Sequence, residues 1–265
     1  DPSNSGHAGG SGRSVASGDI NGDGFADLIV GAYYANPANK NDAGVTYVVF
    51  GKSSGFDPVT DLSTLDGTTT GFRLEGIDAG DRSGRSVSSG DINGDGIDDV
   101  IIGAYRANPG GNADSGETYV VFGKDTDNVG TFDSVIELSG LNGTNGFRIQ
   151  GGYSGDYSGI SVSTGNINGD GFDDVIIGAP RADYGMTYDG GASYVVFGNS
   201  DSFPTTITLN NLNGTTGFVT RGINSRDYSG SSVSSGDING DQIDDLIIGD
   251  DLLLADSNGN NMRQD

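Results

Sequence analysis

Short runs of β-branched and aromatic residues alternate with turns rich in Gly, Asn and Asp along the whole chain. Runs such as Ala26–Val30 and Thr46–Phe50 have the length and composition of β-strands. No window of eleven or more residues has the sustained 3.6-residue period of an amphipathic helix. The pattern therefore predicts an all-β fold with essentially no helix, in which glycine serves the turns.

The pattern recurs with a period of roughly 72 residues. The segment that begins at Ser11 with Ser-Gly-Arg-Ser-Val returns, with small changes, at Ser83, Ser158 and Ser229. This self-similarity divides the chain into repeat 1 (11–82), repeat 2 (83–157), repeat 3 (158–228) and a partial repeat 4 (229–265).

Each repeat contains four predicted strands separated by turn signals. In repeat 1 these strands are Arg13–Ser17, Asp27–Tyr33, Tyr47–Gly51 and Phe72–Leu74. Four short strands per period are typical of a β-propeller blade, which buries its faces against neighbouring blades. The expected fold is thus a β-propeller of four-stranded antiparallel blades with 14 strands in about 3.5 repeats. We favour part of a longer, seven-bladed propeller over a small or assembled ring, because an incomplete last blade leaves unpaired strand edges.

The turn between the first two strands of each repeat is an oxygen-rich loop. Side chains at its first, third, fifth and ninth positions, with the carbonyl at its seventh, can converge on one cation. The predicted ligands are Asp19, Asn21, Asp23, Phe25 and Asp27 in loop 1; Asp91, Asn93, Asp95, Ile97 and Asp99 in loop 2; Asn166, Asn168, Asp170, Phe172 and Asp174 in loop 3; and Asp237, Asn239, Asp241, Ile243 and Asp245 in loop 4.

The donor set favours Ca²⁺, with up to four ions per chain. Calcium takes six to eight oxygen ligands, whereas magnesium requires a stricter octahedron and zinc prefers His or Cys. An EF-hand is excluded because strands flank the loop and no glutamate follows at its twelfth position. The competing interpretation is that Asp, Asn and Gly are simply good turn formers, but four copies in register favour calcium.

The four loops are not equivalent. Loop 3 begins with Asn166 where the others begin with aspartate, and loop 4 has Gln242 where the others have glycine. A non-glycine residue at that turn would have to adopt a left-handed backbone conformation. We therefore expect loops 1 and 2 to bind calcium most tightly.

These motifs resemble the FG-GAP repeat family, which includes the N-terminal propeller of integrin α subunits and many bacterial surface proteins. The Phe-Gly element stands at Phe50–Gly51, Phe122–Gly123 and Phe197–Gly198, and the Gly-Ala-Pro element at Gly178–Pro180. Repeats 1 and 2 have Gly-Ala-Tyr instead, and repeat 4 departs from the pattern after Ile248. The resemblance implies a calcium-binding adhesion or binding module.

Composition narrows the possible partners. The net charge is −24, from 37 acidic and 13 basic residues, so a nucleic acid or an anionic membrane is not an expected partner. The chain has no cysteine and no apolar run of membrane-spanning length. Cytosolic calcium is too scarce for sites of modest affinity, so we expect the protein to be secreted or at the cell surface.

The sequence gives little indication of catalysis. The single histidine, His7, lies in a glycine-rich terminus, and the Gly-Lys-Ser-Ser-Gly segment at 51–55 leads into a polar loop with no histidine after it. The carboxylates in the loops are committed to metal, so no catalytic residue and no organic cofactor site is predicted. We expect that the chain is not an enzyme.

The expected binding surface is the face opposite the calcium loops, where tyrosine and arginine side chains collect. Tyrosine and arginine are favoured anchors for a protein or glycan partner, although the rings could equally pack between blades. Two other functions stay open: self-association as a structural repeat of a fibre or sheath, and a non-catalytic domain of a secreted hydrolase. The residues of this face are Tyr33, Tyr34, Tyr105, Arg106, Tyr153, Tyr157, Arg181, Tyr184 and Tyr228.

Overall fold

Three of the repeats fold into four-stranded antiparallel sheets, as predicted. The structure is a computed structural model that describes residues 10–250, 254–255 and 261–262. Within each blade the strands are hydrogen-bonded in chain order, which matches the arrangement of a propeller blade.

The strand bounds repeat closely from blade to blade. Blade 1 contains β1 (Ser11–Gly18), β2 (Asp27–Ala32), β3 (Val45–Val49) and β4 (Gly71–Glu75). Blade 2 contains β5 (Ser86–Gly90), β6 (Asp99–Ala104), β7 (Glu117–Val121) and β9 (Gly146–Gln150). Blade 3 contains β10 (Ser161–Gly165), β11 (Asp174–Ala179), β12 (Ala192–Val196) and β14 (Gly217–Arg221). Blade 4 consists of β15 (Ser232–Gly236) and β16 (Asp245–Gly249), and a short pair, β17 (Leu254–Ala255) and β18 (Asn261–Met262), follows.

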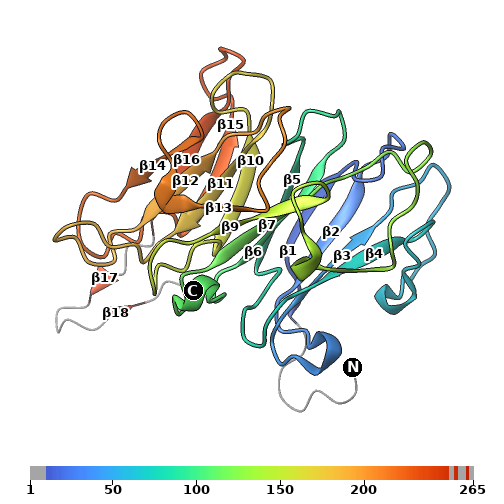
Figure 1. Cartoon of the computed structure of the whole chain (residues 1–265), viewed down its shortest axis with the longest axis horizontal. Helices are drawn as coiled ribbons and strands as arrows, with labels where there is room; N and C mark the ends of the chain where they lie inside the picture. The colour runs from blue at the N-terminus through green and yellow to red at the C-terminus, as the bar shows by residue number, and fades with distance from the viewer. Residues whose placement is uncertain (1–9, 251–253, 256–260, 263–265) are drawn as a thin grey trace.

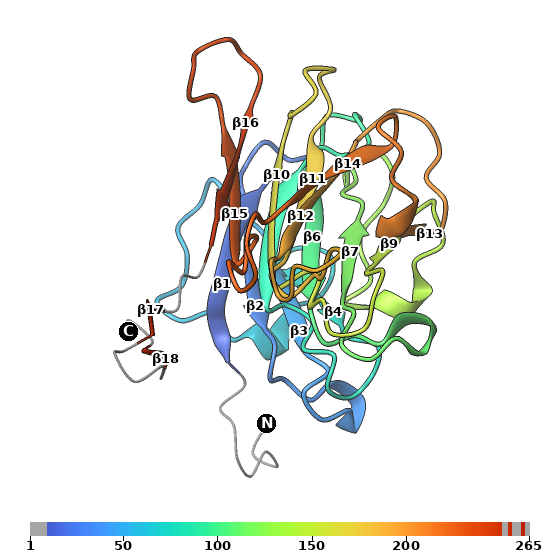
Figure 2. The same cartoon turned by 90° about the vertical axis from the view of Figure 1, so that its left-hand side faces the viewer.

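The blades stand side by side in chain order (Figure 1). Their first strands form the contacts between neighbours: β1 lies against β5, β5 against β10, and β10 against β15. The tips of the β10–β11 and β15–β16 hairpins point to the same side of the molecule (Figure 2). This places the predicted metal loops along one face.

Helical structure is confined to single turns. The described residues contain five 3₁₀ segments of three residues each and no α-helix, which agrees with the expectation from the sequence. They are η1 (Pro37–Asn39), η2 (Leu62–Thr64), η3 (Pro109–Gly111), η4 (Leu138–Gly140) and η5 (Leu209–Asn211). Among the residues that the structure describes, no helix is long and apolar enough to cross a membrane.

Two strands that join the sheets of the blades were not predicted from the sequence. The long connection between the third and fourth strands of blade 2 contains β8 (Val135–Glu137), which pairs in parallel with β4 at the outer edge of blade 1. The equivalent connection of blade 3 contains β13 (Thr206–Thr208), which pairs in parallel with β9. The expected count of 14 strands therefore rises to 16 in the four blades, because each of these connections extends the sheet of the preceding blade.

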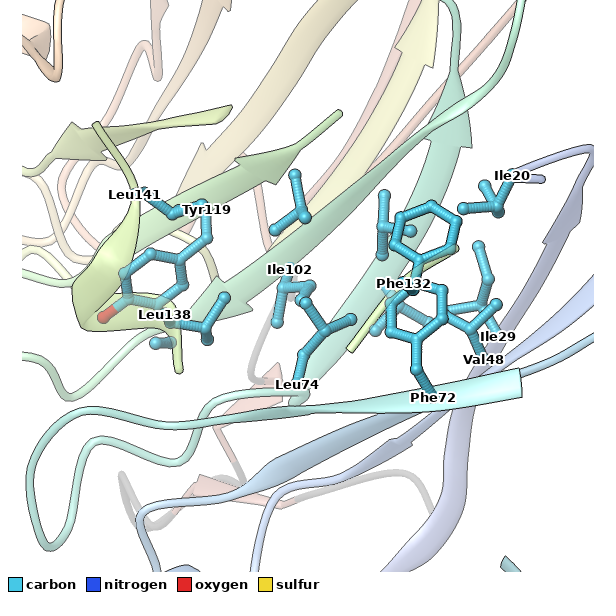
Figure 3. Packing of buried hydrophobic residues seen from close by; sticks show 14 of the residues in the cluster. Ile20, Ile29, Val48, Phe72, Leu74, Ile102, Tyr119, Phe132, Leu138 and Leu141 are labelled. Carbon is cyan, nitrogen blue, oxygen red and sulfur yellow. The ribbon is translucent and has the colours of Figure 1, made fainter. Parts of the chain in front are cut away.

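Aromatic side chains accompany these added strands. The ring of Phe132 stacks on Phe72 of blade 1 with a centroid distance of 4.3 Å, close to Ile20 and Val48 (Figure 3). Phe203 stacks in the same way on Phe147 of blade 2, at 4.5 Å. The apolar core therefore lies between neighbouring blades as well as within them.

Candidate metal loops and the opposite face

The first three side-chain positions of loop 1 point into the turn. Asp19 accepts hydrogen bonds from the backbone N–H groups of Asp23 (3.1 Å) and Gly24 (2.9 Å). Asn21 Oδ1 accepts from Asp23 N–H at 3.0 Å, and Asp23 Oδ1 accepts from Phe25 N–H at 2.9 Å. The side-chain oxygens thus converge on a tight coil of backbone, the arrangement that an oxygen-ligated cation site requires.

The other loops repeat this geometry. In each of them the fifth residue donates its N–H to the side-chain oxygens of the first and third residues, and the seventh donates to the fifth. The oxygens come from Asp91, Asn93 and Asp95 in loop 2, from Asn166, Asn168 and Asp170 in loop 3, and from Asp237, Asn239 and Asp241 in loop 4.

The sixth position distinguishes the loops as the sequence predicted. Gly24, Gly96 and Gly171 adopt φ values of +84°, +86° and +93°, and Gln242 adopts +72° in loop 4. Gln242 therefore occupies the left-handed region that glycine takes elsewhere, a conformation that is costly for a residue with a side chain.

Loop 3 differs at its first residue. In loops 1, 2 and 4 the second carboxylate oxygen of that residue accepts the N–H of the sixth residue, at 2.9 Å in each case. Asn166 presents an amide nitrogen in place of one oxygen, so loop 3 has one acceptor fewer.

The ninth position lies behind the loop. Asp27 is fully buried, and its two oxygens accept the N–H groups of Ile20 (2.9 Å) and Gly51 (2.7 Å). Asp99 and Asp174 make the equivalent bonds to the loop and to the glycine of the Phe-Gly element. This residue ties the loop to the end of the third strand, which gives the Phe-Gly motif a structural role.

Burial governs the acidity of this carboxyl. It raises the pKa of Asp27 to about 6, although the N–H groups of Gly51 and Ile20 lower it, and the charges of Asp23 and Asp19 raise it further. Burial likewise raises the pKa of Asp174 to about 6 and that of Asp99 well above its usual range. Negative charge is thus concentrated around a buried acid in three of the loops.

The structure brings the first, third and fifth positions of each loop together, and holds the ninth through backbone N–H groups. Within residues 10–250, no three His, Cys, Asp or Glu side chains gather closely enough to form a metal-binding group. Each loop as described offers two acidic side chains and an amide, or one acid and two amides in loop 3. The oxygen donors of each loop suit a hard cation. The loops contain no His or Cys side chain, the ligands that zinc prefers.

Neighbouring loops are joined by an additional aspartate that sequence reasoning missed. Asp98, Asp173 and Asp244, at the eighth position, each accept the N–H of the first residue of the preceding loop, at 2.9–3.1 Å. The backbone N–H of each also donates to the carbonyl of that residue. Loop 1 has Ala26 at this position. The Asp-Asp pair that recurs at the start of the second strand in repeats 2, 3 and 4 could have indicated this link from the sequence.

Arginine and tyrosine side chains gather on the opposite face at the junction of blades 1 and 2. Arg82 lies 4.9 Å from the ring centroid of Tyr34 and donates a hydrogen bond to the Tyr105 hydroxyl at 2.7 Å. Arg85 lies about 6 Å from the rings of Tyr33 and Tyr105. We call this group, with Arg106, Tyr157 and Arg181, the arginine–tyrosine face.

The arginine–tyrosine face carries positive charge that no described carboxylate pairs with directly. Only Lys40 and Arg73 form ion pairs among the described residues. Burial lowers the pKa of Arg85, and the neighbouring charge of Arg13 lowers it further. The Nε of Arg106 is buried without a hydrogen-bond partner. Sequence reasoning missed Arg82 and Arg85, although these two of only 13 basic residues stand three positions apart.

The tyrosines predicted for this face differ in how deeply they are buried. Tyr105 is buried and meets the ring of Tyr157 edge-on, with the centroids 5.5 Å apart, whereas Tyr33, Tyr34, Tyr157 and Tyr228 are half-buried. Tyr153 is exposed, and Tyr184 bonds to Tyr194 and lies under Arg221. Tyr157 and Tyr228 have positive φ, like Arg82, so the backbone holds each side chain in a left-handed turn. His7 lies outside the described residues.

The fold and the loops define a blade-repeat protein with one aspartate-rich turn in each repeat. Residues 11–49, 83–121 and 158–196 match the model of the FG-GAP repeat. The chain therefore contains three FG-GAP repeats, as the resemblance implied.

Several known proteins share these repeats. The chain is 29% identical to the phosphatidylinositol-glycan-specific phospholipase D of Bos taurus over 191 residues, which cover 72% of this chain and 21% of that protein. It is 32% identical to integrin alpha-PS2 of Drosophila melanogaster over 171 residues, covering 63% of this chain and 10% of the integrin. The similarity therefore spans a small part of each relative.

Proposed function

We propose that this chain is a calcium-binding module that works outside the cell by binding a partner and has no catalytic activity of its own. The observation that carries the calcium assignment is the fourfold recurrence of one geometry, in which the first, third and fifth side chains of each loop converge. Calcium would be held by these oxygens, the seventh carbonyl and the carboxyl at the ninth position. It would neutralise part of the net charge of −24.

Native mass spectrometry in the presence of calcium tests this assignment directly. The expected result is up to four bound ions, with the first two retained at the lowest calcium concentration. Asp19→Ala and Asp91→Ala should each remove one of these two ions, whereas Asp133→Ala, at an exposed position outside the loops, should remove none. A spectrum with no specific calcium adducts would contradict the proposal.

The proposed partner site is the arginine–tyrosine face. Its guanidinium groups, which form no ion pair with a described carboxylate, and its ring edges fit a carboxylate or sulfate group on a protein or glycan. A glycan array that includes sialylated and sulfated glycans provides the test. Binding should be lost in the Arg82→Ala/Arg85→Ala variant and retained in Lys52→Ala, which removes an exposed positive charge beside the Phe-Gly element that is bonded to loop 1. Equal binding by both variants would exclude this face as the site.

A second function has specific support. Several of the similar proteins are phosphatidylinositol-glycan-specific phospholipases D, and this chain spans only 21% of the bovine protein. The module could therefore serve as the non-catalytic part of a secreted hydrolase. In that case the chain alone should lack phospholipase activity and should bind a separately produced catalytic domain.

A further inference from the structure

The three junctions between blades use one set of contacts. A serine or threonine hydroxyl in the first strand donates to a carbonyl in the first strand of the preceding blade. Ser89 donates to the Ser17 carbonyl at 2.8 Å, Thr164 to Ser89 at 2.6 Å, and Ser235 to Thr164. The N–H of the eighth loop residue also donates to the first residue of the preceding loop, as described above.

A knob-and-hole contact completes each junction. The side chain at the seventh loop position covers the glycine at the fourth position of the preceding loop. A Cβ placed on Gly22 would lie 3.1 Å from Ile97, and one placed on Gly94 would lie 2.1 Å from the ring of Phe172. Ile243 covers Gly169 in the same way, at 2.9 Å. A side chain at these glycines would crowd the knob, most severely at Gly94.

Blade 1 presents the knob side of this junction without a partner among the described residues. Val15 and Leu28 are 58% and 47% exposed, whereas their counterparts Val87 and Val100 are 6% and 0% exposed in the junction with blade 1. Phe25, the counterpart of Ile97, is also exposed.

Blade 4 presents the hole side. Ile238 and Ile247 are 71% and 43% exposed, whereas their counterparts Ile20 and Ile29 are fully buried. A Cβ placed on Gly236 or Gly240 would meet nothing within 4 Å, in contrast to the glycines at the same places in the other blades. The two end faces are therefore complementary halves of a junction that the chain builds three times.

We propose that the free face of blade 1 binds the free face of blade 4 of a second copy of this chain. Phe25 of one copy covers Gly240 of the other, Val15 and Leu28 pack against Ile238 and Ile247, and the Ser17 hydroxyl donates to the Ser235 carbonyl. Because the two faces differ, the contact is head-to-tail and continues into a ring or a filament. The association adds a property to the proposed binding module and does not depend on its ligand.

Engineered disulfides test this contact cleanly, because the chain has no cysteine. Ser88 and Thr164 face each other across the junction of blades 2 and 3, with their hydroxyl oxygens 3.3 Å apart. The equivalent pair across the proposed contact is Ser234 of one copy and Ser17 of the other. Ser17→Cys and Ser234→Cys proteins are prepared separately, mixed under mild oxidation and run on a non-reducing gel.

The mixture should form a heterodimer at least tenfold more efficiently than either protein forms a homodimer. The Ser17→Cys/Ser234→Cys double variant should give a ladder of linked oligomers, and Phe25→Asp in that background should suppress it. The Ser88→Cys/Thr164→Cys protein, which should close within one chain, is the geometric control. Cross-linking of the mixture no better than that of the single variants, while the control closes, would overturn the proposal.

Discussion

The carboxylate of Asp98 in blade 2 accepts a hydrogen bond from the N–H of Asp19 in blade 1 at 2.9 Å. The backbone N–H of Asp98 returns a hydrogen bond to the carbonyl of Asp19 at 3.1 Å. Asp19 is also the first predicted metal ligand of loop 1. The two loops are therefore mechanically joined, and ordering one of them should favour the ordered form of the next.

Replacing Asp98 should weaken the junction of blades 1 and 2. Asp98→Ala leaves the Asp19 N–H without its acceptor and is expected to lower the free energy of unfolding by about 1–2 kcal/mol. Burial raises the pKa of Asp98, which offsets part of that loss at neutral pH. Urea denaturation followed by circular dichroism measures the change. Asp98→Asn, which keeps one acceptor oxygen, should lose less, and an Asp98→Ala protein as stable as the wild type would contradict the role of this bond.

The stacked Phe132 should contribute more to stability than any single loop residue. It is buried against Phe72 and Phe50, so Phe132→Ala should cost about 3–4 kcal/mol. Phe56 occupies the same position in repeat 1 but is 57% exposed, so Phe56→Ala should change stability by less than about 0.5 kcal/mol. Chemical denaturation of both variants in dilute solution makes the comparison. Equal losses in the free energy of unfolding would contradict a special contribution of the Phe132–Phe72 stack to stability.

The left-handed turn of loop 4 should be improved by glycine. Gln242→Gly removes the strain of a side chain at φ +72° and is expected to stabilise blade 4 by about 1 kcal/mol. Gly96→Gln in loop 2 is the matched reverse change, since a Cβ at Gly96 meets nothing within 4 Å and adds only backbone strain. It should destabilise by about the same amount. Hydrogen exchange of the β15–β16 and β5–β6 amides reports each blade separately.

Stability should depend on pH through two buried acids outside the metal loops. Burial raises the pKa of Asp81 to about 7, with the charges of Asp78 and Glu117 adding to the effect, and burial raises that of Asp156 to about 7. An acid whose folded pKa lies above its unfolded value stabilises the protein when protonated. That stability is present below about pH 4 and is lost as the pH rises towards 7 and beyond.

Asp81→Asn isolates this contribution. The amide oxygen can still accept the Asp78 N–H that the Asp81 carboxylate accepts at 3.1 Å. The variant should gain stability relative to the wild type at pH 8 and lose a large part of that advantage by pH 5, as measured by urea midpoints in calcium-free buffer. A difference between the two proteins that stays constant from pH 5 to 8 would refute the assignment.

The sequence predicted the blades well because their determinants are local. The period, the four strands of each blade, the coil of the loops and the left-handed Gln242 all follow from turn residues and short apolar runs. It did not predict β8 and β13, because those segments are strands only through pairing with the preceding blade. It also missed Asp98 as a link between loops, because its partner, Asp19, lies in another blade. It missed Arg82 and Arg85 as part of the opposite face, because the tyrosines that they contact lie in other connections of the repeats.

The ninth loop position shows the same limit within a single loop. Spacing alone places Asp27 beside Asp19 and Asp23 as an equal ligand. In the structure the Asp27 carboxylate also accepts a hydrogen bond from the N–H of Gly51, which lies 24 residues later in the chain. This bond joins the loop to the Phe-Gly element. It depends on how two strands pair, so the sequence of the loop alone does not predict it.

The predicted difference between loops offers a graded test of calcium binding. Asn166→Asp restores the missing acceptor oxygen and adds one negative charge at the first position of loop 3. It should tighten the weakest class of calcium sites roughly three- to tenfold in a calorimetric titration. Asn168→Asp adds the same charge at the third position of the same loop, where the other loops also have asparagine. Four equal sites in the wild-type protein would contradict the ranking.

Thermal unfolding with and without calcium tests the central claim most directly. Ligand that binds only the folded state must raise stability by mass action, by about 2.7 kcal/mol at a hundredfold excess over the dissociation constant. The melting temperature should therefore rise by several degrees in millimolar calcium, fall on addition of a chelator, and respond less to magnesium. A melting temperature that is identical in calcium, magnesium and chelator would show that the aspartate loops are only turns.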